Sequence, residues 1–172
     1  MSDSKEKSIL QQYIKFNELQ EKKVQEEKIK AKELYTQIIT HPLIRQASES
    51  HFKHEKYRSA VLDAMVQLEQ MIKTKAKFPK NNRGKELSGS KLMHRVFDSN
   101  DPILNWCSND TQIGKDELEG YKLIMAGAMI GIRNPKAHAI FTINPIRAVK
   151  LLTLATLLAE LVDASKYVTK DK

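Results

Sequence analysis

The chain has 172 residues, of which 41% are hydrophobic and 29% are charged, and its formal net charge at pH 7 is +8. The apolar fraction excludes a disordered chain, and no run reaches the roughly 20 consecutive apolar residues of a membrane span. The N-terminal residues lack the apolar segment of a signal peptide, and the single cysteine, Cys107, cannot form an internal disulfide. We therefore expect a soluble, cytoplasmic, single-domain protein that does not contact a membrane.

The positive charge is concentrated in one part of the sequence. Residues 1–36 carry eight lysines and seven acidic residues, so +7 of the net charge of +8 lies in residues 37–172. A positive field favours encounter with polyanions such as nucleic acid. Many basic proteins bind no nucleic acid, however, so charge alone does not establish RNA as a partner.

Residues 4–39 are predicted to form one long helix, because they contain no Pro or Gly and many Glu, Lys and Gln residues. Their apolar residues keep no strict heptad, so a long coiled coil is only weakly indicated. We interpret residues 1–39 as an N-terminal helical arm that projects or packs, or that contacts a second copy. The alternative is a solvated helix with frayed ends. Residues 40–168 are then a helical domain, and residues 169–172 a C-terminal tail.

The helical domain starts after His41-Pro42, since the residue before a proline is pushed out of the α region. Apolar residues spaced three and four apart predict the clearest helix, from Tyr57 to a point before Phe78-Pro79. Three further helices are expected over 43–51, 115–132 and 145–167. A short helix that carries Leu92 and Phe97 is expected to be capped by Ser88 or Ser90. A turn is expected to follow, with Asp101 as its cap and Pro102 at its first position.

The last of these helices is expected to begin with Asn144 as its cap and Pro145 at its first position. Its leucines cover more than one face, which is typical of a helix buried in a bundle or shared with a second subunit. Trp106, the only tryptophan, is interpreted as a core anchor. No segment alternates convincingly between apolar and polar residues, so the expected fold class is all-α.

Most common catalytic signatures are missing from the sequence. It has no glycine-rich phosphate loop, no HExxH, no paired cysteines and no GxSxG. The five histidines form no i,i+4 pair, so we expect no metal site and no cofactor. Cys107 has apolar neighbours, and we interpret it as an inert packing residue.

One polar segment joins the two most apolar helices, from Gly131 to His138 (GIRNPKAH). Pro135 forces the chain out of the helix, which places Arg133 at a helix C-terminus with His138 about one turn on. Arginine offers a permanently charged fork for phosphate, and histidine exchanges a proton near neutral pH. The pair suits metal-free phosphodiester cleavage. Alternatively, Arg133 only neutralises the helix end, His138 is a surface residue and the segment is a turn.

The pattern RNPKAH between two long apolar helices resembles the R-x4-H signature of the HEPN superfamily. The wider sequence resembles one branch of that superfamily, the bacterial Ymh-type proteins, over residues 41–162. The residues that carry this similarity are His41-Pro42-Leu43-Ile44, Phe52, Tyr57, Ala60-Val61, Gly89-Ser90-Lys91-Leu92-Met93, Phe97, Gly127, Gly131-Ile132-Arg133-Asn134-Pro135 and Ala137-His138.

The resemblance implies a compact helical bundle that forms a homodimer and brings two R-x4-H motifs together across a symmetric cleft. Many HEPN members are metal-independent endoribonucleases that act as toxins or in phage defence. This implies RNA as the substrate, and an antitoxin or a larger defence-system protein as a further partner. Carried over to this chain, Arg133 would contact the scissile phosphate, His138 would be the general acid or base, and Asn134 would position or polarise the reacting groups.

Contacts to the RNA backbone are predicted on electrostatic grounds for Lys136, Arg58, Lys91 and Arg95. For each of these residues the alternative is a solvated surface position. Two other functions also stay open. The chain can be a non-catalytic RNA-binding or regulatory HEPN module, or a helical assembly protein in which the arm mediates assembly and the motif is a turn.

Overall fold

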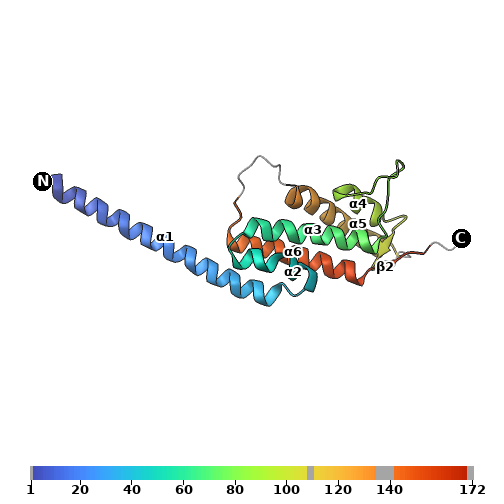
Figure 1. The fold of residues 1–172 in the computed structure, drawn as a ribbon, viewed down its shortest axis with the longest axis horizontal. Helices are drawn as coiled ribbons and strands as arrows, with labels where there is room; N and C mark the ends of the chain where they lie inside the picture. Colours follow the sequence, from blue (N-terminus) through green and yellow to red (C-terminus); the bar gives the residue numbers. More distant parts are fainter. Residues whose placement is uncertain (1, 108–110, 135–141, 170–172) are drawn as a thin grey trace.

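The computed structural model describes residues 2–107, 111–134 and 142–169, and this part of the chain is mostly helical (Figure 1). The all-α prediction is confirmed, with one small two-stranded sheet in addition. The elements are α1 (Ser2–Ile38), α2 (Pro42–Lys53), α3 (Tyr57–Lys75), α4 (Gly89–Val96), β1 (Leu104–Asn105), α5 (Gln112–Ala128), the π-helix η1 (Met129–Arg133), α6 (Pro145–Ala164) and β2 (Lys166–Tyr167).

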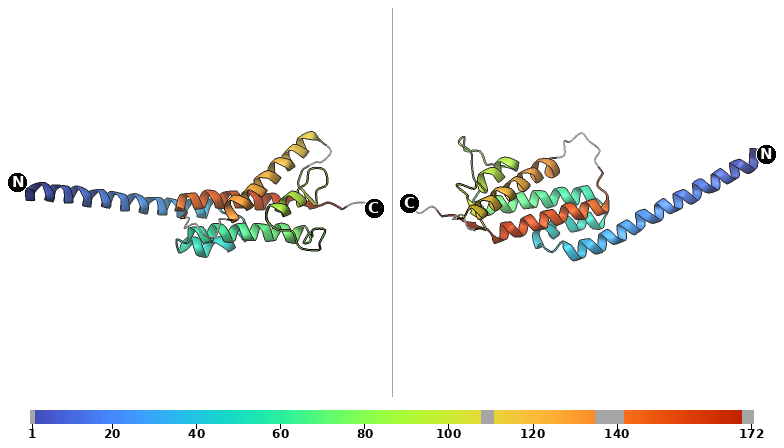
Figure 2. Two further views of the ribbon diagram at one scale, coloured as in Figure 1. Left: turned by 90° about the horizontal axis from the view of Figure 1, so that it is seen from above. Right: turned by 180° about the vertical axis from the view of Figure 1, so that it is seen from behind.

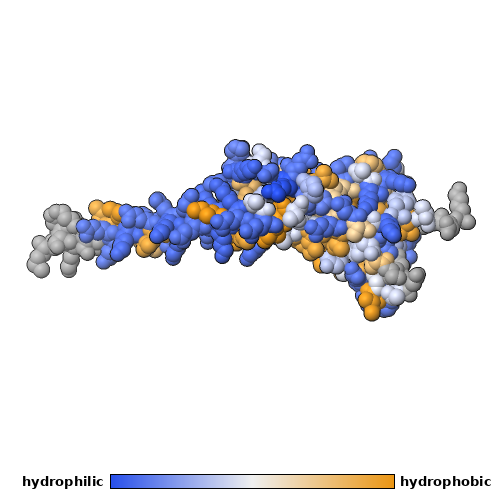
Figure 3. Space-filling view, turned by 90° about the horizontal axis from the view of Figure 1, so that it is seen from below, coloured by the Kyte–Doolittle hydropathy of each residue, from blue (hydrophilic) through white to orange (hydrophobic). Residues whose placement is uncertain are grey.

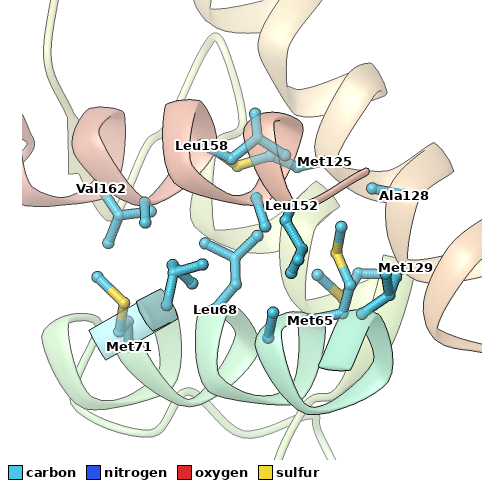
Figure 4. Packing of buried hydrophobic residues seen from close by; sticks show 14 of the residues in the cluster. Met65, Leu68, Met71, Met125, Ala128, Met129, Leu152, Leu158 and Val162 are labelled. Carbon is cyan, nitrogen blue, oxygen red and sulfur yellow. The ribbon is translucent and has the colours of Figure 1, made fainter. Parts of the chain in front are cut away.

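Helix α3 lies at the centre of the bundle. It packs against α2 and α6 and also contacts η1 and α4, while α5 packs on α4 and runs away from α3 at an angle (Figures 1 and 2). Figure 4 shows the α3 residues Met65 and Leu68 lying close to Leu152 of α6 and Met129 of η1, and all four side chains are fully buried. Burying one such side chain contributes about 2 kcal/mol. The apolar spacing in the sequence therefore identified the central helix of the core.

The long N-terminal helix confirms the prediction for residues 4–39, and it projects away from the bundle (Figure 1). Only its C-terminal turns pack: Ala31 and Tyr35 are buried, as is Ile39 just beyond the helix, and the Tyr35 hydroxyl lies 2.9 Å from Ser48 Oγ. The projecting part is mostly hydrophilic, with separate hydrophobic residues along it (Figure 3). Its exposed apolar residues are Leu10, Tyr13, Ile14, Phe16, Leu19, Val24 and Ile29.

The predicted turn after Pro102 is wrong, and so is the end of the last helix. Asp98, rather than Asp101, organises this region, because its Oδ1 accepts from the backbone N–H groups of Asn100 (2.9 Å) and Asp101 (3.0 Å). The chain then runs extended, and β1 pairs antiparallel with β2 in the register Leu104 to Tyr167. Helix α6 ends at Ala164 instead of continuing to Tyr167, since the following residues complete this sheet.

Helix α5 starts three residues earlier than predicted and ends differently. Thr111 caps it, because its hydroxyl oxygen accepts from Gly114 N at 3.1 Å. After Ala128 the helix widens into η1, in which the backbone hydrogen bonds span five residues instead of four. The prediction of a single α-helix over 115–132 is therefore correct in its location and wrong in its last turn.

The N-terminal caps of α6 and α4 agree only in part with the predictions. Asn144 caps α6 as predicted, since its Oδ1 accepts from Arg147 N at 2.7 Å, and Pro145 is the first helical residue. Ser88 occupies the N-cap position of α4, but its side chain makes no capping hydrogen bond. Among the helices of the described segments, none has the length and apolar character needed to cross a membrane.

Candidate functional site

The polar motif begins in the last turn of η1, where Arg133 is the final residue. A single π turn inside a longer helix is a local irregularity that occurs frequently at functional sites. Asn134 then leaves the helix with φ −100° and ψ 51°, outside the α region that a following proline disfavours. The helix end therefore presents Arg133 and the exposed Asn134 side by side at the edge of the bundle.

Arg133 is held by a carboxylate from the central helix. Its Nε lies 3.0 Å from Oε2 of Glu69 in α3, and Glu69 is 2% exposed. Lys73, one helical turn further along α3, places its Nζ 3.3 Å from the other carboxylate oxygen, Oε1. The Arg133 side chain keeps 28% of its surface exposed. The Nε edge of the guanidinium is thus ion-paired to a core carboxylate, without hydrogen-bond geometry at either Glu69 oxygen within the described segments, while the side chain as a whole still reaches solvent.

The start of α4 lies on another side of this guanidinium from Glu69. The backbone of Gly89, the first residue of α4, lies against it, because a Cβ at Gly89 would sit 3.9 Å from Arg133 Nη1. The first turn of α4 contains no acidic residue, and the positive end of the helix dipole points out of this turn. An anion next to Arg133 would meet a permanent charge and a helix N-terminus together.

Glu69 was not among the site residues predicted from the sequence. It falls within the apolar stripe of α3, four residues after Met65 and three before Ile72, and is buried with them. A carboxylate on a core-facing stripe is costly to bury unless a cation pairs with it. The signal that could have revealed Glu69 was therefore an acidic residue at a core position, with Lys73 following at i+4.

Two predicted site residues, Lys136 and His138, lie outside the described residues. The other predicted RNA-contact residues, Arg58, Lys91 and Arg95, differ in their surroundings. Arg58 lines a cavity of about 60 Å³ together with Gly131 and Ile132, immediately before Arg133. Arg58 Nε is buried and has no hydrogen-bond partner within the described segments.

Lys91 and Arg95, the two predicted RNA contacts on α4, have different surroundings. Lys91 is exposed on the first turn of α4, two residues after Gly89, and lines an open groove with Asn81, Asn82 and Arg83. Arg95 is on the last turn and is already engaged by Asp101. Its Nη1 donates to the Asp101 carbonyl oxygen at 2.9 Å, and its Nη2 lies 3.4 Å from Asp101 Oδ2. The structure therefore places Arg58 beside the residues that precede Arg133, leaves Lys91 in an open groove with Asn81, Asn82 and Arg83, and engages Arg95 in the turn before β1.

The lone thiol matches its interpretation as a packing residue. Burial raises the pKa of Cys107, and its Sγ donates to Asn105 Oδ1 (3.2 Å) and to the Gly114 carbonyl oxygen (3.1 Å). A raised pKa lowers the fraction of reactive thiolate. In the described part of the chain, no three His, Cys, Asp or Glu residues are grouped so that they could hold a metal ion.

A family model matches most of this bundle. It is described as "Protein of unknown function (Hypoth_ymh)" and covers residues 38–162, from the end of α1 to the last turns of α6. The match includes Glu69 and Arg133. No curated protein and no solved structure matches the chain. The chain belongs to the Hypoth_ymh family.

Proposed function

We propose that this protein is a metal-independent endoribonuclease of the HEPN type, acting in a toxin or anti-phage defence setting. Arg133, Asn134 and His138 form its R-x4-H motif. The 2′-hydroxyl oxygen of the RNA attacks the adjacent phosphorus and the bond to the 5′-oxygen breaks. This leaves a 2′,3′-cyclic phosphate and a 5′-hydroxyl. His138 takes the proton from the 2′-hydroxyl or supplies one to the leaving oxygen, while Arg133 stabilises the charge that builds up on the phosphate.

The observation that carries this proposal is the anchoring of Arg133. An arginine that merely neutralises a helix end needs no buried partner, whereas Arg133 is tied to Glu69 at 3.0 Å and stays 28% exposed. A fixed guanidinium loses little freedom when it binds a phosphate. The positive end of α4 and the cationic side chains of Arg58 and Lys91 further favour a polyanion at this edge.

A homodimer is part of the proposal, and an uncovered face of α5 supports it. Leu123 (55% exposed), Ile124 (45%) and Ile130 (59%, in η1) lie three, four and ten residues after Gly120, and are therefore on one side of the helix. A Cβ on Gly120 or Gly127 would meet nothing within 4 Å. Such an apolar face with small residues allows close approach by another helix. It continues directly into Arg133, so a second copy bound there would lie beside the motif.

The proposal is tested by incubating the protein with total RNA and with a labelled oligoribonucleotide in EDTA. We expect the wild type to cleave, and Arg133→Ala and His138→Ala to lower the rate by about 100-fold or more. His94→Ala, at an exposed histidine of α4, is the matched control and should leave the rate unchanged. Cleavage that persists in His138→Ala would contradict the assigned site. Binding of the oligonucleotide by a wild type that does not cleave would favour a non-catalytic RNA-binding module.

A further inference from the structure

Glu69 is a buried charge whose placement the fold alone does not require. It lies on the core face of α3 and is 2% exposed. Isolating a carboxylate from water costs several kcal/mol unless cations compensate for it, and an apolar residue of similar size is often as stable at such a position. An uncharged residue would continue the apolar stripe formed by its neighbours Met65, Leu68 and Ile72. Retaining a carboxylate here therefore points to a role beyond packing.

The two carboxylate oxygens are divided between two cations. Oε1 lies 3.3 Å from Lys73 Nζ, which comes from the next turn of the same helix. Oε2 lies 3.0 Å from Arg133 Nε, which comes from η1 at the far end of a separate helix. The contact to Lys73 is local, whereas the contact to Arg133 joins two elements that are 64 residues apart in sequence. Glu69 consequently links the motif arginine to the central helix of the bundle.

The contact engages Arg133 on its Nε side. Neither terminal nitrogen of the guanidinium, Nη1 or Nη2, forms a hydrogen bond within the described segments. Nη1 faces the backbone of Gly89 at the start of α4. A planar guanidinium held by one edge keeps its other donors in a fixed direction, and a phosphate needs such paired donors for bidentate binding.

We propose that Glu69 is the positioning residue of the site, which orients Arg133 so that its terminal nitrogens meet the scissile phosphate. This inference rests on the proposed function and adds to it a residue outside the R-x4-H motif. Glu69 does not touch the substrate. Its carboxylate acts through Arg133, and Lys73 offsets the remaining negative charge.

A positioning role for Glu69 and a purely structural role predict different effects on RNA binding and on turnover. Glu69→Gln keeps the shape of the side chain and removes one negative charge, so the site becomes more positive. Attraction of RNA should then be unchanged or stronger, while the rate at saturating RNA falls, because a small misplacement of a catalytic group can cost about 100-fold. The matched control is Glu49→Gln in α2. Glu49 also lies between an arginine and a lysine, with Arg45 Nε at 3.9 Å and Lys53 Nζ at 3.0 Å, and its loss changes the net charge equally.

The experiment compares wild type, Glu69→Gln and Glu49→Gln in kcat and KM for RNA, and in affinity for a 2′-O-methyl oligonucleotide that cannot be cleaved. We expect kcat to fall at least tenfold in Glu69→Gln alone, with no loss of affinity. Adding Glu69→Gln to Arg133→Ala should lower kcat no further, because Glu69 acts through Arg133. A wild-type kcat in Glu69→Gln, or an equal further loss in the Arg133→Ala background, would overturn the inference.

A second readout does not depend on cleavage, and its wild-type part does not depend on a variant folding. In NMR spectra of the wild type, the Arg133 Nε–Hε signal should be visible with slow rotation about the Nε–Cζ bond. It should shift in Glu69→Gln and stay in place in Glu49→Gln. A freely rotating Arg133 guanidinium in the wild type would overturn the positioning role. If Arg133 is fixed by Glu69 and the wild type still cuts no RNA, the positioning role stands and the proposed ribonuclease function fails instead.

Discussion

Gly89 lies directly against Arg133, so that a Cβ at Gly89 would sit 3.9 Å from Arg133 Nη1. The two residues come from different elements, the start of α4 and the end of η1. Gly89 also has φ +58°, a left-handed conformation that residues with a side chain adopt at a cost. The backbone geometry at the start of α4 thus leaves space next to the guanidinium of the motif arginine.

Gly89→Ala separates these two features of the position. Placing alanine in the left-handed region should destabilise the fold by about 1–2 kcal/mol. The added methyl group would be at an ordinary contact distance from Arg133, so it should not displace the guanidinium. We expect a lower midpoint of urea unfolding, together with an unchanged cleavage rate per folded molecule. A rate loss much greater than the loss of folded protein would show that α4 must approach Arg133 more closely than it does in this structure.

Truncating the arm tests the interpretation of the protein as an assembly module. Removing residues 1–24 deletes only exposed side chains of the described part of the arm and leaves the Lys28–Glu55 ion pair and the buried Ala31 and Tyr35 in place. The truncated chain should keep its thermal unfolding midpoint, its oligomeric state and its cleavage rate. Removing residues 1–38 also deletes Ala31 and Tyr35 and should destabilise the fold markedly. Loss of assembly on removing residues 1–24 alone would favour the arm as the oligomerisation element.

The uncovered face of α5 makes a prediction about oligomeric state. Ile124→Lys places a charge in the middle of this face and should convert the proposed dimer to a monomer, because a buried unpaired charge is strongly unfavourable in an interface. Leu157→Lys is the control, since Leu157 is exposed to a similar extent (44%) on α6. Analytical ultracentrifugation at several concentrations measures both. Dimers that persist in Ile124→Lys would place the interface on another face.

The α4–α5 region is expected to lose stability in acid, in part because of the lowered pKa of Glu119. Hydrogen bonds from Lys122 and then Ser99 lower the pKa of Glu119 below its ordinary value of 4.5. A carboxyl group with a lowered folded-state pKa stabilises the fold fully above its unfolded pKa and loses that contribution as the pH falls through the folded value. Wild type should therefore be more stable to urea than Glu119→Gln at pH 7, and the difference should be smaller at pH 3. An equal difference at both pH values would contradict this assignment.

The parts of the fold that could be predicted from the sequence are those that depend on neighbouring residues. The apolar spacing of α3 and the Asn144-Pro145 start of α6 are local signals, and both elements begin where the sequence indicated. The pairing of Leu104 with Tyr167 joins residues 63 positions apart, so no local pattern could reveal it. The same holds for the engagement of Arg95 by Asp101, which depends on the path of the turn between them.

The same distinction between local and long-range signals applies to the candidate site. The motif itself is contiguous, so Arg133 and Asn134 could be identified from the sequence, and in the structure Arg133 ends η1 and Asn134 follows it directly. Glu69 could not be assigned to them, because an acidic residue within an apolar stripe gives no indication of which cation it meets. Only the packing of η1 against α3 brings Arg133 within reach of Glu69.

The measurement that tests the central claim most directly compares two labelled oligonucleotides in EDTA. One is entirely RNA, and the other carries a single 2′-deoxy sugar at the position where the first is cut. If Arg133 and His138 promote attack by the 2′-hydroxyl, the RNA is cut with a 2′,3′-cyclic phosphate end and the substituted oligonucleotide stays intact at that position. Cleavage at the 2′-deoxy position would contradict the account, because attack would then come from water rather than from the RNA itself.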